Sequence, residues 1–201
     1  MKPRLKNEHF TDHSNGYEQV AETFNAIRIK NTIGVSSVQN WVQGLPAHAS
    51  ILELGCGTGL PITKVLLEQA VKVYAIDASP TLLSNFRQNF PDVPNRLEAV
   101  QNSDFFGRKF DGILAWGLLF LLSEGEQLAL IKKASESLVH GGRFLFTAPE
   151  QPATWKDVLT GQPSVSLGAT TYRSMLSNFG MEIIDTFQDE GENHYFEAQK
   201  I

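Results

Sequence analysis

Apolar residues recur along this chain at two different periods, which predict strands that alternate with helices. Short, mostly apolar segments at 51–54 and 71–76, and the segment 110–115, are typical of strands buried on both faces of a sheet. Two further strands are expected at 96–100 and 143–147. Apolar residues at helical spacing mark the segments 17–27, 35–45, 61–66, 80–90, 124–138 and 171–179. This alternation predicts a parallel sheet with helices on both faces.

The end of the chain has a different pattern, in which two strands follow each other directly. Segments 181–187 and 195–199 have the composition of strands, and the polar turn 189–193 joins them. We therefore expect an α/β fold with a doubly wound, seven-stranded sheet, mostly parallel, with an antiparallel hairpin at its C-terminal edge. No repeat or long linker interrupts the sequence, so one domain is expected over 1–201. Its expected parts are an N-terminal helical cap (1–48), a core (49–150) and a C-terminal segment (151–201).

Capping residues and glycine mark the expected helix boundaries. Ser79 followed by Pro80 is a typical helix start, and Ser123 with Glu126 three residues later forms a capping box. Other boundary candidates are Ser36 and Ser37 as N-caps of the second helix and Gly141-Gly142 as the end of the fifth. Residues expected to face the core include Tyr17, Val20, Ala21, Phe24 and Ile27 in the first helix and Leu128, Ile131, Ala134 and Leu138 in the fifth.

Composition narrows the class of protein further. The 201 residues are 42% hydrophobic and 19% charged, which excludes a disordered chain or a coiled coil. The longest mostly apolar run, 113–122, is too short for a membrane span, and a single cysteine excludes an internal disulfide. A net charge of −5 is unsuited to a nucleic-acid partner. We therefore expect a cytoplasmic protein that binds neither membranes nor nucleic acids.

A glycine-rich loop follows the first predicted strand at 53–59, where the sequence is Glu-Leu-Gly-Cys-Gly-Thr-Gly. Doubly wound sheets bind ligands where such a loop joins a strand to a helix, and glycine allows the backbone to approach a ligand closely. Asp77 ends the second strand, and a carboxylate there can accept bonds from both hydroxyls of a ribose. The dinucleotide fingerprint needs a third glycine where Leu60 or Ile62 stands. A nucleoside ligand is therefore expected, and NAD is disfavoured.

Four motifs, in order, resemble those of the class I S-adenosylmethionine-dependent methyltransferases. The loop at 53–59 resembles the family's first motif, and 73–80 (Val-Tyr-Ala-Ile-Asp-Ala-Ser-Pro) resembles the second. Segment 110–115 is similar to the family's fourth strand, and 138–144 to the segment after its core. The resemblance covers 17–149 and is to the small, single-domain members, of type 11 or 12. It implies a Rossmann-like fold and transfer of a methyl group in line from S-adenosylmethionine to an oxygen or nitrogen nucleophile, which leaves S-adenosylhomocysteine.

The resemblance also implies which residues contact the cofactor. Glu53 would lie near the positively charged methionine end, and Asp77 would hold the ribose. Asn102, followed by Ser103, stands where the family often has an acidic residue at the adenine. Either Asn102 hydrogen-bonds an adenine edge, or Asp104 takes this place after a small shift in register. Cys56 is interpreted as a small loop residue and not as a nucleophile. The expected set is Tyr17, Glu53, Gly55, Cys56, Gly57, Gly59, Asp77, Ala78, Asn102, Ser103 and Trp116.

The acceptor is defined by fewer residues. Trp116 follows the fourth strand, where family members that methylate exocyclic amino groups of adenine or glutamine carry Asn/Asp-Pro-Pro-Tyr, so those acceptors are disfavoured. An aromatic residue there either suits an apolar or cationic small molecule or is part of the core, and Tyr17 likewise either closes over the methyl donor or packs in the core. Acceptor-side candidates are Trp116, Trp155 and His194, and candidates for a general base are His9, His13 and His194. No metal site is expected.

Three functions are consistent with these residues. The first is a methyltransferase that acts on a small molecule, as the family's members without an added nucleic-acid-binding domain commonly do. The second is a nonenzymatic protein that binds S-adenosylmethionine. The third is an NAD-dependent oxidoreductase, which the spacing of the glycines opposes. Both a monomer and a homodimer are consistent with the sequence.

Overall fold

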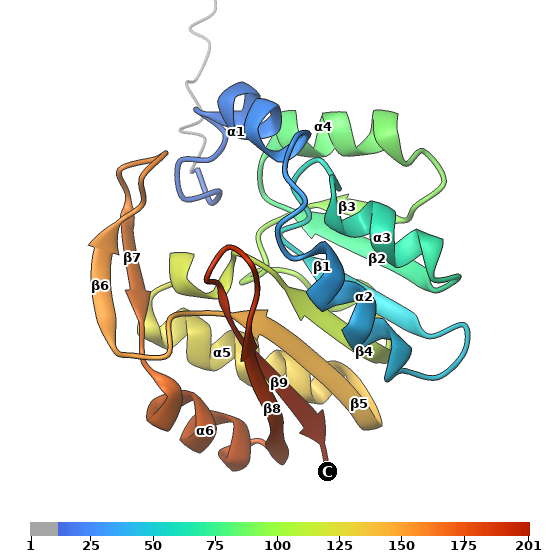
Figure 1. Cartoon of the computed structure of the whole chain (residues 1–201), viewed down its shortest axis with the longest axis vertical. Coiled ribbons are helices and arrows are strands. Elements are labelled where there is room, and N and C mark those ends of the chain that lie inside the picture. Colours follow the sequence, from blue (N-terminus) through green and yellow to red (C-terminus); the bar gives the residue numbers. More distant parts are fainter. Residues whose placement is uncertain (1–11) are drawn as a thin grey trace, which may run out of the picture.

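The computed structural model describes residues 12–201, whose centre is a seven-stranded sheet (Figure 1). The strand order is β3-β2-β1-β4-β5-β9-β8. Strands β1 to β5 run parallel, β9 is antiparallel to β5, and β8 forms the edge. The strands are β1 (Ser50–Leu54), β2 (Lys72–Asp77), β3 (Asn95–Leu97), β4 (Phe110–Ala115), β5 (Leu138–Thr147), β8 (Met181–Gln188) and β9 (His194–Lys200). The expected doubly wound sheet with a hairpin at its C-terminal edge is confirmed.

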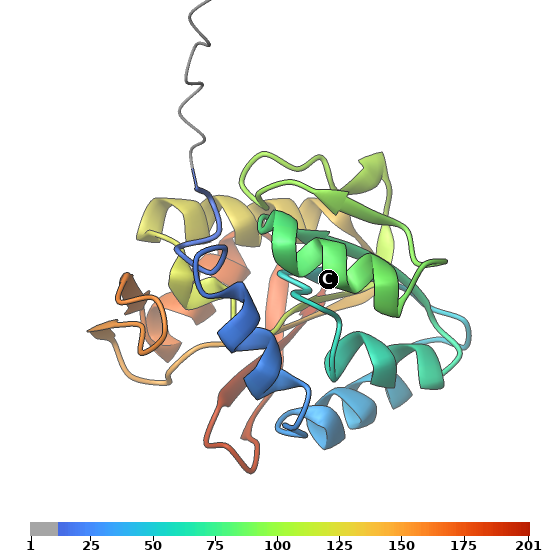
Figure 2. The ribbon, with the colours of Figure 1, turned by 90° about the horizontal axis from the view of Figure 1, so that it is seen from above.

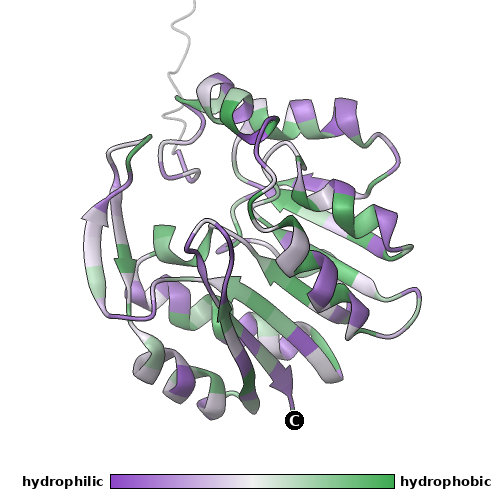
Figure 3. Cartoon of the chain, in the orientation of Figure 1, coloured by the Kyte–Doolittle hydropathy of each residue, from purple (hydrophilic) through white to green (hydrophobic). Residues whose placement is uncertain are grey.

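Helices cover both faces of this sheet (Figure 1), and hydrophobic positions are frequent along its central strands (Figure 3). Two apolar clusters fill the space between helices and strands. Side chains alternate along a strand, so Leu52 and Leu54 join one cluster while Ile51 joins the other. One face carries α2 (Val35–Gln43), α3 (Ile62–Glu68) and α4 (Pro80–Asn89), and the other carries α5 (Glu124–Ser137) and α6 (Ala169–Asn178). Both faces are thereby buried, which leaves the carboxyl edge of the parallel strands for a ligand.

The N-terminal helix α1 (Ala21–Arg28) lies above that carboxyl edge and contacts α4 (Figure 2). Both views place it between α4 and a small hairpin on the opposite side of the molecule (Figures 1 and 2). Among residues 12–201, no helix has the length and hydropathy that crossing a membrane requires.

That small hairpin is a second sheet, which the sequence pattern does not predict. Strand β6 (Ala153–Lys156) pairs antiparallel with β7 (Pro163–Ser166). Each strand is only four residues long, and a proline begins β7, so neither gives a clear strand signal. Strand β7 contacts η2 (Leu119–Leu121), the 3-10 turn that comes after β4. The hairpin therefore stands beside the carboxyl edge of the main sheet.

Two expected helix starts are confirmed. Ser79 is the N-cap of α4, where its Oγ accepts a hydrogen bond from Leu82 N at 3.1 Å, and Pro80 is the first helical residue. Ser123 and Glu126 form the expected capping box of α5. In both places, local capping chemistry decides where the helix begins.

The candidate caps Ser36 and Ser37 are wrong, because both lie inside α2. The N-cap is Gly34, which has a left-handed backbone (φ 85°). A Cβ atom at this position would come within 2.7 Å of Trp116 Nε1 and 2.8 Å of Tyr195 Oη. Contacts with distant parts of the chain, and not a capping side chain, therefore set this boundary.

The expectation that Gly141-Gly142 ends the fifth helix is also wrong. Helix α5 ends at Ser137, and the chain enters β5 at the next residue, so both glycines lie within the strand. Gly141 is left-handed (φ 79°), and the pairing of β4 with β5 shifts register between Phe110 and Gly112. The glycines therefore accommodate an irregular strand. Strand β3 is likewise shorter than the expected 96–100, since pairing with β2 stops at Leu97.

Two residues expected to face the core are exposed instead. Ile27 of α1 is 46% exposed and Leu128 of α5 is 39% exposed. The buried residues nearest to them in the sequence are Arg28 and Gln127. The helical period is correct, since Ala21, Ile131, Ala134 and Leu138 are buried as expected, but at one position in each helix a polar side chain, Arg28 or Gln127, is buried in place of the apolar residue beside it.

Candidate functional site

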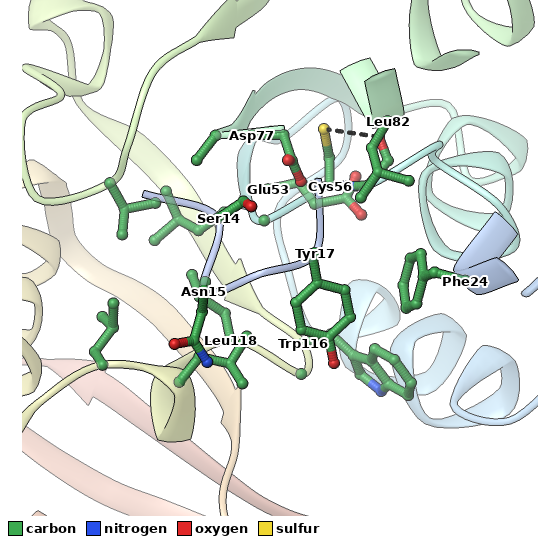
Figure 4. A pocket seen from close by; sticks show the side chains of 18 of the residues that line it. Ser14, Asn15, Tyr17, Phe24, Glu53, Cys56, Asp77, Leu82, Trp116 and Leu118 are labelled. Carbon is green, nitrogen blue, oxygen red and sulfur yellow. Dashed lines mark hydrogen bonds between the residues drawn. The ribbon is translucent and has the colours of Figure 1, made fainter. Parts of the chain in front are cut away.

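A cavity of about 380 Å³ lies at the carboxyl ends of β1, β2 and β4 (Figure 4). This is the edge at which doubly wound sheets bind ligands. Of the residues expected at the cofactor, those that line the cavity are Tyr17, Glu53, Gly55, Cys56, Gly57, Asp77, Ala78 and Trp116. The fold thus brings together residues that are far apart in the sequence.

The glycine loop presents its backbone to the cavity. Gly55 and Gly57 are left-handed, with φ of 69° and 56°, and both line the cavity. Gly59 is also left-handed (φ 79°) but does not line it. A Cβ atom on Gly59 would come within 2.7 Å of Phe90 Cδ2, so this glycine is needed where α4 packs against the loop.

Asp77 joins the glycine loop to the start of α4. Its Oδ2 accepts from Gly57 N at 2.7 Å, and its Oδ1 accepts from Ser79 N at 2.8 Å. Burial raises the pKa of this carboxyl to about 6, and the two backbone bonds oppose that rise. Each carboxylate oxygen has more than one acceptor site, so Asp77 can still accept bonds from a ligand hydroxyl.

Glu53 is a second buried carboxyl on the cavity wall, 3% exposed. Its Oε2 accepts from Thr63 Oγ1 at 2.6 Å. Burial raises its pKa to about 8, and the nearby charge of Asp77 adds to the rise while Arg28 opposes it. A positively charged group in the cavity would therefore be favoured beside Glu53.

Arg28 is a cavity residue that the sequence analysis missed. It is 6% exposed, and its guanidinium carbon lies 4.1 Å from the centroid of the Trp116 ring. Burial lowers its pKa. None of the described residues forms an ion pair with it. The available signal was its spacing, four residues after Phe24 and seven after Ala21, which places a cation on the buried face of α1.

Trp116 is held in place by a chain of hydrogen bonds. Its Nε1 donates to Tyr195 Oη at 2.6 Å, and Tyr195 Oη donates to Asp189 Oδ2 at 2.8 Å. Asp189 lies in the turn between β8 and β9, so the C-terminal hairpin fixes the indole against which Arg28 stacks. Trp116 is thus both a wall of the cavity and a support for Arg28.

Residues 12–20, which we call the strap, cross the cavity. Tyr17 Oη donates to Asp157 Oδ2, at the end of the β6–β7 hairpin, at 3.0 Å. Glu18 accepts from Thr81 N at 3.0 Å, from Thr81 Oγ1 at 2.6 Å and from Ser79 Oγ. Burial and the charge of Asp157 raise the pKa of Tyr17, so its phenol remains a donor. The strap is therefore anchored to the hairpin on one side and to α4 on the other.

The structure places Asn102 and Ser103 away from the cavity. Asn102 is exposed. Ser103 is buried, where its Oγ donates to Glu98 Oε1 at 2.8 Å and accepts from Phe105 N at 3.0 Å. Val100 and Gln101 line the cavity in their place.

Two acceptor-side candidates lie outside the lining. Trp155 packs on Phe120, a lining residue, with 5.4 Å between ring centroids. His194 packs edge-on against Phe196, while the preceding residue, Asn193, reaches the cavity.

The other two candidate bases have different positions. His13 lines the cavity as part of the strap. His9 lies outside the described residues. Within residues 12–201, no cluster of three or more His, Cys, Asp or Glu side chains is arranged to hold a metal ion.

Residues 51–142 match a family described as the methyltransferase domain. The chain carries a methyltransferase domain. The matched range includes the glycine loop, Asp77 and Trp116, which line the cavity described above. The methyltransferase class expected from the four motifs is thus confirmed. No curated protein matches the sequence significantly.

Solved structures share the fold of this methyltransferase domain at low sequence identity. The 1,6-didemethyltoxoflavin-N1-methyltransferase of Burkholderia thailandensis has a TM-score of 0.74 and 18% identity, over 100% of this chain and 92% of that one. CalS10, an amino pentose methyltransferase from Micromonospora echinaspora, has a TM-score of 0.72 and 15% identity, over 98% of this chain and 100% of that one. The glycopeptide N-methyltransferase MtfA has a TM-score of 0.69 and 16% identity, over 84% and 90%. These similarities confirm the Rossmann-like methyltransferase fold.

Proposed function

We propose that the chain is an S-adenosylmethionine-dependent enzyme that methylates an oxygen or nitrogen of a small molecule. The observation that carries this proposal is that the glycine loop and Asp77 meet in one cavity of the methyltransferase domain. A carboxylate at the end of β2 suits the two hydroxyls of a ribose. The cavity also has the size range of cofactor sites.

We infer the direction of S-adenosylmethionine in the cavity from the order of the strands. Strands β1, β2 and β3 are neighbours in the sheet, and their carboxyl ends carry Glu53, Asp77 and then the loop with Val100 and Gln101. With the ribose at Asp77, the methionine end lies toward Glu53 and the purine toward Val100 and Gln101. Ala78, directly after Asp77, lies beside the nucleoside.

The charges in the cavity fit the methionine end. Glu53 would hold the ammonium group, and Arg28, which no described carboxylate neutralises, would hold the carboxylate. A buried cation and a buried carboxyl are each costly without a partner, and a zwitterionic ligand supplies both partners. Arg28 therefore joins the proposed cofactor residues, and Gly59 and Ser103 support the loops that carry them.

The chain contributes to the reaction by positioning the two reactants and by excluding water from the site. S-adenosylmethionine, when bound, supplies a methyl group that is already activated by its sulfonium. The strap and Trp116 enclose that end of the cavity, which limits the approach of the acceptor to one direction. Holding two reactants in line contributes up to about 7–11 kcal/mol in favourable cases. If the acceptor must lose a proton, His13 is the candidate base that reaches the cavity.

In this proposal, the acceptor lies against the wall that Phe120 and Asn193 line, and Trp155 packs behind Phe120. The neighbours named above methylate 1,6-didemethyltoxoflavin, an amino pentose and a glycopeptide, which supports a small-molecule acceptor and not a nucleic acid. We assign the chain to the cytoplasm, because its single cysteine is buried and unpaired. We also propose that 1–201 form one methyltransferase unit.

A melting experiment tests cofactor binding first. With S-adenosylhomocysteine at about 100 times its dissociation constant, stability should rise by about 2.7 kcal/mol, a shift of about 5–11 °C for this chain length. NAD at the same concentration should give no shift. A shift with NAD alone would overturn the proposal in favour of an oxidoreductase. Transfer of labelled methyl groups to a panel of small amines and alcohols then separates an enzyme from a protein that only binds the cofactor.

A further inference from the structure

The loop 99–104 forms the cavity wall next to β3. Val100 and Gln101 line the cavity, so in the proposed function this wall contacts the purine. The loop leaves the sheet after β3 ends at Leu97, and its carbonyl groups therefore have no partner strand. Three of these carbonyl groups accept hydrogen bonds from one side chain.

That side chain is Lys133, which projects from α5 behind the wall. Its Nζ donates to Val100 O at 3.0 Å, to Gln101 O at 3.0 Å and to Ser103 O at 2.8 Å. An ammonium group has three N–H donors, so these bonds use all of them. The same nitrogen lies 5.1 Å from the centroid of the buried Phe105 ring. A single lysine thus fixes the backbone of the loop over four residues.

Helix α5 also fixes the side chain of Gln101. Gln101 Nε2 donates to Glu126 Oε1 at 3.0 Å, and Glu126 Oε2 accepts from Ser123 N at 2.9 Å. Because a carboxylate only accepts, this bond orients the amide, and Gln101 Oε1 is left to accept from a ligand. An amide oxygen at this position suits the 6-amino group of adenine and not the 6-oxo group of hypoxanthine.

We propose that Lys133 is a positioning residue for purine recognition, which holds Val100 and Gln101 so that the site selects a 6-aminopurine. Lys133 does not touch the cavity itself and acts through the backbone of the loop. This inference rests on the proposed function, because the purine is that of S-adenosylmethionine.

Base selectivity is the readout that separates this role from a general loss of stability. We would measure dissociation constants of S-adenosylhomocysteine and S-inosylhomocysteine by calorimetry for the wild type and for Lys133→Met. The wild type should prefer the adenosyl ligand by about tenfold or more, the scale of one well-placed hydrogen bond. Lys133→Met should weaken adenosyl binding about tenfold and bring the ratio of the two constants close to one.

Lys132→Met is the matched control. Lys132 is the adjacent residue on α5, but it is exposed, and within residues 12–201 its ion pair is with Glu136, with Nζ and Oε1 3.8 Å apart. It should leave both dissociation constants unchanged. If Lys133→Met does not fold, Lys133→Gln replaces it, because glutamine keeps two N–H donors on a shorter side chain. The ratio of its two dissociation constants should lie between the wild-type ratio and one.

The outcomes separate the two proposals. If the ratio of the two dissociation constants in Lys133→Met equals the wild-type ratio, the role of Lys133 is overturned while the proposed function stands. The same applies to Lys133→Gln where it replaces Lys133→Met. A loss of selectivity in Lys132→Met as well also overturns it, because any change on α5 would then act alike. A wild type that binds neither ligand overturns the proposed function itself.

Discussion

Both carboxylate oxygens of Asp77 accept hydrogen bonds from the protein backbone before any ligand binds. The bonds to Gly57 N and Ser79 N connect the glycine loop to the first turn of α4. A ribose bound there would complete the set of hydrogen bonds around a buried acid whose charged form is otherwise disfavoured. Loss of this one side chain should therefore affect binding strongly.

We expect Asp77→Ala to weaken binding of S-adenosylhomocysteine by about 10- to 150-fold, the loss of charge-assisted bonds of about 1.5–3 kcal/mol. Calorimetry measures the change. Asp111→Ala is the control, because Asp111 Oδ2 accepts from Ser50 N at 2.8 Å at the opposite edge of the sheet. It should lower stability and leave the dissociation constant unchanged. An equal loss of affinity in both variants would show that Asp77 acts only through the fold.

Gly59 supports a prediction about stability. Its left-handed backbone and its approach to Phe90 should make Gly59→Ala destabilising by about 1–3 kcal/mol or more. Gly125, in the first turn of α5, has nothing within 4 Å of an added Cβ. Gly125→Ala should therefore stabilise by about 0.5–1 kcal/mol. Urea denaturation of both variants measures the difference, and a neutral Gly59→Ala would contradict the packing argument.

The sequence predicts best those site residues that lie at the end of a clearly predicted strand. The glycine loop follows the first strand and Asp77 ends the second, and the structure brings both to the cavity. Arg28 was missed because a hydropathy pattern treats a charged residue as exposed. The sequence predicts a contact at Asn102, whereas the residues of this loop that line the cavity are Val100 and Gln101, because β3 ends at Leu97.

At the scale of elements, the strap depends on contacts that no local pattern encodes. Tyr17 and Asp157 are 140 residues apart in the sequence, and the hairpin that carries Asp157 was not predicted. The same holds for β5, which pairs with β4 both before and after its two glycines. Local sequence signals predict elements with strong periodicity and caps, such as α4 and α5. The strap contacts and the irregular part of β5 depend instead on tertiary contacts.

Tyr17→Phe removes one hydroxyl from the anchor of the strap. Loss of its bond to Asp157 should cost about 0.5–1.5 kcal/mol of strap closure, so S-adenosylhomocysteine should dissociate about 2- to 12-fold faster. Stopped-flow displacement measures this rate. The control is Tyr74→Phe, which removes a phenol that bonds to Arg108 far from the strap. The strap argument fails if Tyr17→Phe and the wild type release the ligand at the same rate.

At the scale of the whole molecule, the fold brings three buried ionisable side chains together at one edge of the sheet. Two apolar clusters fill both faces of the sheet, while the carboxyl edge buries Glu53, Asp77 and Arg28 in one cavity. The clusters supply the stability that allows these buried ionisable groups to persist. The free protein should therefore show the cost of these groups in its pH dependence.

Raised pKa values predict that the free protein loses stability as the pH rises. Glu53 has a pKa of about 8 and Asp77 of about 6, against ordinary values of 4.5 and 3.8. The folded state therefore binds more protons than the unfolded chain between these values, so the free energy of unfolding falls with increasing pH. Asp77 contributes up to about pH 6, and Glu53 continues to about pH 8. Melting curves of Glu53→Gln should decline less between pH 6 and 8 than those of the wild type, whereas exposed Glu136→Gln should match the wild type.

Ligand binding should reverse this effect at Glu53. An ammonium group beside the carboxylate favours its charged form, so S-adenosylhomocysteine that binds near pH 7 should release a proton from Glu53. Calorimetry in buffers with different ionisation enthalpies measures that release, which should approach one proton per molecule in the wild type and disappear in Glu53→Gln. If the wild type releases no more than Glu53→Gln, the ammonium does not lie at Glu53. The methionine end would then have to be placed elsewhere in the cavity.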